Sequence, residues 1–167
     1  MFYAIIALAA FSRLVPHPLN FAPIGALGLF AGSYLDRRWA WVVPLAALLL
    51  SDAVLGFYSP LLMLFVYGGF AAGALLGHRF LRESRTPLRI LGCSLASASA
   101  FFLLSNFGCW VVGMYPHTLT GLTQCYAMAL PFFGNSLLGD LFYSTALFSL
   151  YALALRVAAK NQIAGAA

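Results

Sequence analysis

The stretch PLLMLFVYGGFAAGALLG, residues 60–77, contains no charged side chain. A helix that crosses a membrane needs about 20 mainly apolar residues, because the hydrocarbon core is about 30 Å thick and a helix rises about 1.5 Å per residue. Residues 60–77 therefore predict a transmembrane helix. Similar apolar runs lie on both sides of this stretch.

The composition extends this interpretation to the whole chain. The 167 residues are 63% hydrophobic and only 8% charged, whereas soluble domains are about 25% charged. We expect one integral membrane domain, residues 1–167, with an all-α fold. The predicted spans are 2–15, 21–35, 39–57, 60–77, 90–112 and 136–155.

The region between the last two predicted spans is harder to assign. Its apolar part, residues 119–133, is about 15 residues long, which is short for a span. It contains Pro131 and is followed by Asn135. We predict a short interfacial or re-entrant helix at 119–133 that ends at Pro131, with Asn135 capping the last span.

The basic residues predict the orientation. Lys and Arg accumulate in short cytoplasmic loops of membrane proteins. Six spans with both termini cytoplasmic leave only Arg13 outside. A seventh crossing would move two basic residues outward. In the six-span arrangement the cytoplasmic set is Arg37, Arg38, Arg79, Arg82, Arg85, Arg89, Arg156 and Lys160. The formal charge of +5 thus indicates orientation in a bilayer and not nucleic-acid binding.

Small residues mark a second feature of residues 60–77. Gly69, Gly73 and Gly77 recur every four residues and form one smooth helix face. Such faces let two helix backbones approach closely. The pattern fits internal packing of the bundle and also docking of a separate membrane subunit.

Almost all of the polar residues that are not cytoplasmic loop charges fall in the outer half of the predicted bundle, where they favour an outward-facing pocket for a small, partly polar organic molecule. Carboxylates within spans usually face a partner or a watery cavity. We therefore expect Asp52 and Asp140 to share an outer cavity with Arg13, His17 and Asn106. The full set of candidate binding residues is Arg13, His17, Asn20, Asp52, Tyr58, Asn106, Trp110, Tyr115, His117, Asn135 and Asp140.

Structural roles also fit several of these residues. Asp52 or Asp140 can form an ion pair with Arg13 that ties the first loop to the bundle. The two histidines can be solvated loop residues, and the aromatic residues can be anchors at the membrane interface.

Cofactor and enzyme chemistry have little support in the sequence. Cys93, Cys109 and Cys125 show no CxxC spacing and lie in or beside apolar segments, so we expect no metal site and no disulfide framework. No HExxH, GxSxG or phosphate-loop motif occurs. We expect a protein that is not an enzyme and uses no cofactor.

Four groups of residues carry a resemblance to a known family: PHPLNFAPIGA at 16–26; Ser51-Asp52 with 56–58; 105–108 with Trp110 and 113–116; and 131–133 with Asn135 and 139–141. They resemble an uncharacterised family of small membrane proteins of the bacterial inner membrane. That family is similar to the substrate-binding subunits of energy-coupling-factor transporters.

The resemblance implies a six-helix subunit that captures a vitamin-like micronutrient in an outward pocket. It also implies partners, a transmembrane coupling subunit and ATPases, because the chain has no phosphate loop of its own. Two alternatives remain open at this point. One is a solitary transporter without ATPases, and the other is a scaffold subunit for envelope assembly.

Overall fold

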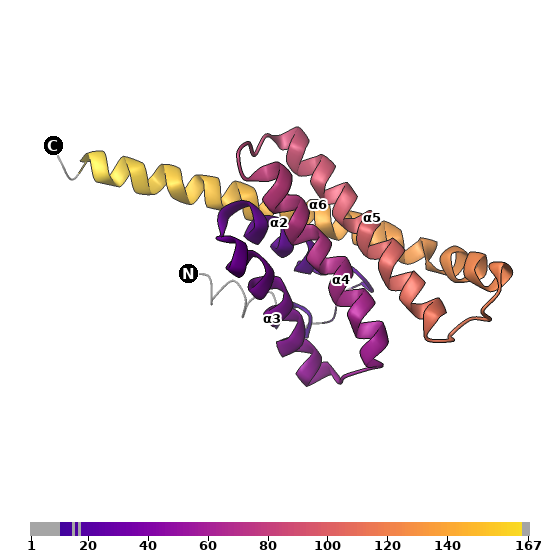
Figure 1. Cartoon of the computed structure of the whole chain (residues 1–167). Helices are drawn as coiled ribbons and strands as arrows, with labels where there is room; N and C mark the ends of the chain where they lie inside the picture. The colour runs from indigo at the N-terminus through magenta and orange to yellow at the C-terminus, as the bar shows by residue number, and fades with distance from the viewer. Residues whose placement is uncertain (1–10, 15, 17, 165–167) are drawn as a thin grey trace.

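The computed structural model describes residues 11–14, 16 and 18–164, and in this part of the chain the regular elements are all helices (Figure 1). They are α2 (Ile24–Tyr34), α3 (Arg37–Leu55), α4 (Pro60–Leu76), the π-helical turn η1 (Gly77–Leu81), α5 (Pro87–Val111) and α6 (Leu119–Ala164). The predicted span 2–15 lies mostly outside the described residues.

Four segments are long and apolar enough to cross a membrane: Arg37–Leu55, Pro60–Leu81, Pro87–Val111 and Leu119–Gln162. The ends of α3, α4 and α5 agree with the predicted spans to within a few residues. The all-helical fold is therefore confirmed for the described part of the chain, and four of its segments could span a membrane.

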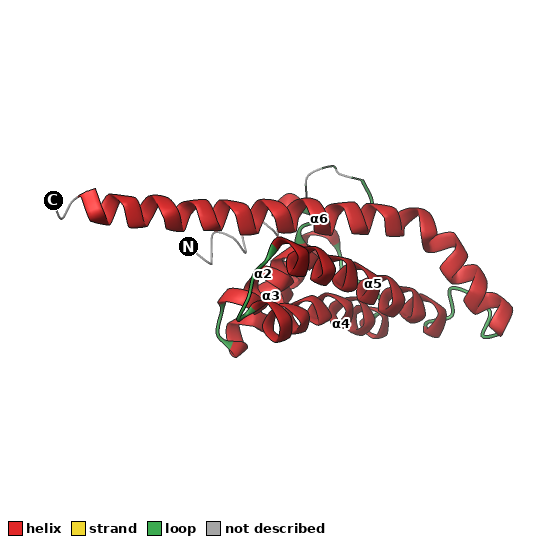
Figure 2. Ribbon diagram, turned by 90° about the horizontal axis from the view of Figure 1, so that it is seen from above, coloured by secondary structure: helices red, strands yellow, loops and turns green. Residues whose placement is uncertain are grey.

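The loops alternate between two ends of the bundle (Figure 1). The α2–α3 and α4–α5 loops lie at one end, which we call the basic end because it carries Arg37, Arg38, Arg79, Arg82, Arg85 and Arg89. The α3–α4 and α5–α6 loops lie at the opposite end. The last turns of α6 project past the basic end (Figures 1 and 2).

Helix α2 is short and central. Its 11 residues extend about 16 Å, and every residue from Ile24 to Ser33 is buried. The carbonyl groups at its C-terminus are bonded by side chains of the α4–α5 connection, since Arg85 donates to the Ser33 oxygen and Arg82 donates to the Leu35 oxygen at 3.3 Å. Positive charge at a helix C-terminus also offsets the helix dipole. These contacts satisfy carbonyl groups that have no partner within α2.

The small-residue face of α4 packs against α2. A Cβ atom at Gly77 would overlap the Leu29 carbonyl, and one at Gly32 would overlap the Ala74 carbonyl. A Cβ atom at Gly73 would lie 3.2 Å from the Gly25 oxygen. Gly69 faces another neighbour, Phe101 of α5. The glycine face is therefore covered by helices of the same chain.

Helix α6 corrects one prediction. The sequence predicted a helix over 119–133 that ends at Pro131 and a separate span over 136–155. The structure instead has one helix of 46 residues with Pro131 inside it. Proline removes one backbone hydrogen bond and bends a helix, but it does not have to end it, and α6 is visibly bent (Figure 2). Asn135 is not a helix cap, and its amide donates to the Leu19 oxygen at 2.9 Å.

Candidate functional site

A cavity of about 330 Å³ lies between α4, α5, α6 and the connection that precedes α2. On α5, which starts at the basic end, its lining begins at Ala98 and reaches Cys109. The cavity therefore occupies the half of the bundle away from the basic end. It is lined by Arg13, Asn20, Ala22, Val66, Phe70, Ala98, Phe101, Phe102, Ser105, Asn106, Cys109, Ala129, Phe132, Ser136 and Asp140.

Asp140 is the acidic side chain in this lining. It is 6% exposed, and its carboxylate accepts hydrogen bonds from the Ser97 hydroxyl and the Ala26 backbone N–H. Ala26 lies in the first turn of α2, where backbone N–H groups have no partner within the helix. Asp140 thus caps α2 from a distant helix.

Gly25 makes this capping contact possible. A Cβ atom at position 25 would overlap the carboxylate of Asp140. Only glycine therefore lets the Asp140 side chain approach the start of α2 so closely. The position of the Asp140 side chain therefore depends on α2 as well as on α6.

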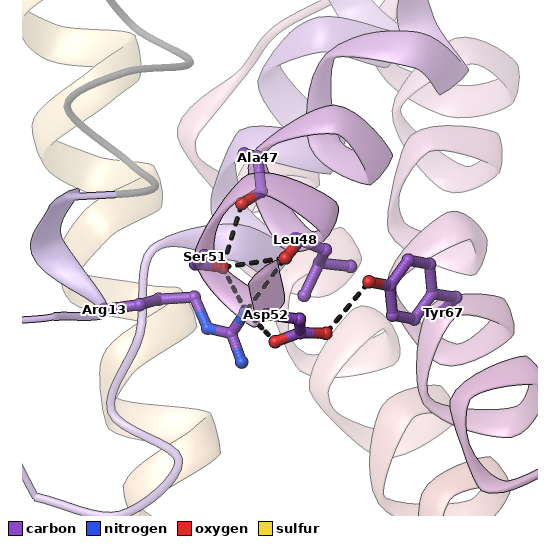
Figure 3. Close-up of polar contacts among 6 residues, drawn as sticks. All are labelled: Arg13, Ala47, Leu48, Ser51, Asp52 and Tyr67. Carbon is purple, nitrogen blue, oxygen red and sulfur yellow. Dashed lines mark hydrogen bonds and ion pairs between the residues drawn. The ribbon is translucent and has the colours of Figure 1, made fainter. Parts of the chain in front are cut away.

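Asp52 belongs to a second polar cluster (Figure 3). Arg13 Nη1 lies 2.8 Å from Asp52 Oδ1, and the Tyr67 hydroxyl donates to Oδ2 at 2.9 Å. Arg13 also donates to the Ser51 hydroxyl. Asp52 is 2% exposed, so its charge is balanced inside the protein. The cluster ties the first loop to α3 and α4.

The predicted shared cavity is thus only partly present. Arg13, Asn106 and Asp140 line it, whereas Asp52 does not and is connected to it through Arg13. Asn20, another predicted residue, lines the cavity with a left-handed backbone of φ 64°. His17 lies outside the described residues.

The other predicted binding residues do not line this cavity: Asn135 lies on α6 and bonds to the Leu19 oxygen, and Tyr58, Trp110, Tyr115 and His117 lie at the end opposite the basic end. Trp110 donates its indole N–H to the Pro116 oxygen at 2.9 Å, and His117 Nε2 lies 2.8 Å from the Trp110 oxygen. With Tyr115 between them, these residues fold the α5–α6 loop onto itself. Tyr58 lies in the α3–α4 loop, where burial and the nearby Asp52 carboxylate raise its pKa to about 12.

Several lining residues were missed by sequence reasoning. Phe70, Phe101, Phe102 and Phe132 supply the aromatic surface of the cavity. In the sequence of a transmembrane helix, a phenylalanine that faces a cavity cannot be distinguished from one that faces lipid. The small residues of the lining, such as Ala98 and Ser105, could not be identified either, because the sequence does not show which of them face a cavity. Among the described residues, no group of three or more His, Cys, Asp or Glu side chains is placed to hold a metal ion.

The comparison with known proteins gives one result. Residues 1–162 match a family described as a family of unknown function (DUF6580). The chain belongs to this family. No curated protein and no solved structure matches the chain. The description of the family states no activity.

Proposed function

We propose that this protein captures a small organic molecule in the cavity between α4, α5 and α6, as the substrate-binding subunit of an uptake system in the bacterial inner membrane. The observation that carries the proposal is the cavity itself. At about 330 Å³ it falls within the size range of small-molecule sites. Its lining combines aromatic rings, an amide at Asn106 and a buried carboxylate at Asp140, the usual mixture for a specific ligand.

The direction of uptake follows from the proposed orientation. In the six-span arrangement the basic end faces the cytoplasm, because Lys and Arg are retained on that side. The cavity lies in the other half of the bundle and so faces outward. A chain without a phosphate loop needs partners to drive uptake, and we propose a transmembrane coupling subunit and ATPases.

The orientation can be tested with reporter fusions. Fusions at Ser84, in the α4–α5 loop, and at Lys160, near the end of α6, are expected to read cytoplasmic. A fusion at Ser59, in the α3–α4 loop, serves as the matched control and is expected to read periplasmic. A periplasmic reading at Ser84 or Lys160 would contradict the six-span orientation and the outward-facing cavity.

The binding role can be tested by native mass spectrometry of gently purified protein. We expect a small molecule to co-purify with the wild type and to be lost from Ser105→Phe, because the new ring fills the cavity. Ser99→Phe is the matched control. Ser99 lies on the same helix, its hydroxyl also bonds to the carbonyl four residues earlier, and it does not line the cavity. Equal loss from both variants, or no ligand in any sample, would count against the proposal.

The same preparation separates the alternatives. Uptake into vesicles that contain this protein alone would indicate a solitary transporter without ATPases. Co-purification of envelope enzymes in the absence of any small molecule would indicate a scaffold subunit.

A further inference from the structure

The positive and negative side chains around the cavity do not balance one another. Arg13 is the cation of the lining, and it is already engaged by Asp52 at 2.8 Å and by the Ser51 hydroxyl. Asp140 has no cationic partner among the described residues, in which the ion pairs are Arg13–Asp52 and Arg82–Asp36. An ionised Asp140 therefore leaves the cavity one negative charge in excess.

The carboxylate of Asp140 has capacity left for a ligand. An ionised carboxylate offers about four acceptor positions, and Asp140 uses two, for the Ser97 hydroxyl and the Ala26 N–H. These two contacts fix its orientation, while the side chain still forms part of the cavity wall. The remaining positions suit a donor that carries positive charge, because charge-assisted hydrogen bonds are the stronger ones.

Aromatic rings surround the same space. Phe70 and Phe101 stack with their ring centroids 4.3 Å apart, and both line the cavity together with Phe102 and Phe132. The faces of aromatic rings attract cations, and cages of such rings bind organic ammonium groups. The rings come from α4, α5 and α6 and thus line several sides of the cavity.

We infer that the cavity binds an organic cation, an amine or a quaternary ammonium compound, with Asp140 as its counter-charge and the four phenylalanines as its aromatic surroundings. This inference rests on the proposed binding function and adds the chemical class of the ligand. An anionic ligand is disfavoured because Arg13 would have to leave Asp52 to meet it. The resulting site has a charged centre on α6 and an apolar wall on α4 and α5.

The test uses choline and its neutral isostere 3,3-dimethylbutan-1-ol, which differ in charge but hardly in shape. Binding to the purified full-length protein is measured by isothermal titration. We expect choline to bind at least about tenfold more tightly, as a charge-assisted contact would give. Asp140→Asn is expected to remove this preference. Asparagine is nearly the same size, and its amide oxygen can still accept the Ala26 N–H.

A second variant, Phe132→Leu, tests the inference independently in case Asp140→Asn does not fold. Phe132→Leu changes a side chain that is 38% exposed and lies outside the α2 capping contact. It is expected to weaken choline binding more than binding of the neutral alcohol, because leucine has no ring face.

Other outcomes overturn the inference. Equal affinities for the two probes, tighter binding of the alcohol, or a choline preference that survives Asp140→Asn would each do so. Binding of neither probe would also remove it. In all these cases the proposed function is judged separately, by whether a molecule co-purifies and is lost from Ser105→Phe. A neutral or anionic co-purified molecule would leave that function in place and refute the cation inference.

Discussion

Gly77→Leu is expected to prevent formation of a stable bundle. A Cβ atom at Gly77 would overlap the backbone carbonyl of Leu29, and backbone cannot move aside as the end of a flexible side chain can. The leucine must separate α2 from the end of α4. Overpacking typically destabilises by about 1–3 kcal/mol, and a clash with the backbone of a fully buried helix places this variant above that range. The measurement is thermal unfolding in detergent, with the yield of monodisperse protein.

Gly68→Leu is the control for this experiment. It makes the same change on α4, at a position where an added Cβ meets nothing within 4 Å. We expect its melting temperature to stay near that of the wild type. If the two variants behave alike, the close approach of α2 and α4 is not needed for stability.

Arg13→Leu is expected to destabilise the protein by about 3 kcal/mol. Removing one partner of a buried ion pair leaves the other charge uncompensated, which typically costs about 3–5 kcal/mol. The lower end applies here because the Arg13 side chain is 19% exposed and because Tyr67 continues to donate to Asp52. Chemical or thermal unfolding of the purified variant gives the difference.

The double variant Arg13→Leu with Asp52→Leu completes this test. Removing both charges abolishes the uncompensated carboxylate, so stability should recover in part relative to Arg13→Leu alone. If the double variant loses more stability than Arg13→Leu and Asp52→Leu lose when their separate effects are added, the ion pair is not the source of the destabilisation. If Arg13→Leu is as stable as the wild type, the contact with Asp52 does not hold the first loop.

The long apolar runs made the helices predictable, as residues 60–77 illustrate: α4 starts at the predicted residue and ends one residue earlier. The ion pair of Arg13 with Asp52 could also be anticipated, because few charges lie in the outer half and a buried carboxylate needs a partner. These features depend on composition and spacing.

Other features of the structure were not predictable. Pro131 looks like a helix end, yet α6 continues through it. The hydrogen bonds of Trp110 to the Pro116 oxygen and of His117 to the Trp110 oxygen were also not anticipated. The role of Asp140 at the start of α2 requires two segments more than 100 residues apart to meet. No sequence pattern encodes that meeting.

The continuity of α6 has a mechanical consequence. The helix contributes Phe132, Ser136 and Asp140 to the cavity wall and then continues unbroken to Ala164. The 24 residues after Asp140 extend about 36 Å, and Phe148 and Tyr151 within them pack against Phe30 of α2. A tilt of α6 by about 5° about Asp140 would move its end by about 3 Å. The same helix carries Arg156 and Lys160, so any rigid tilt of α6 at the cavity would also displace two positive charges at the far side of the protein.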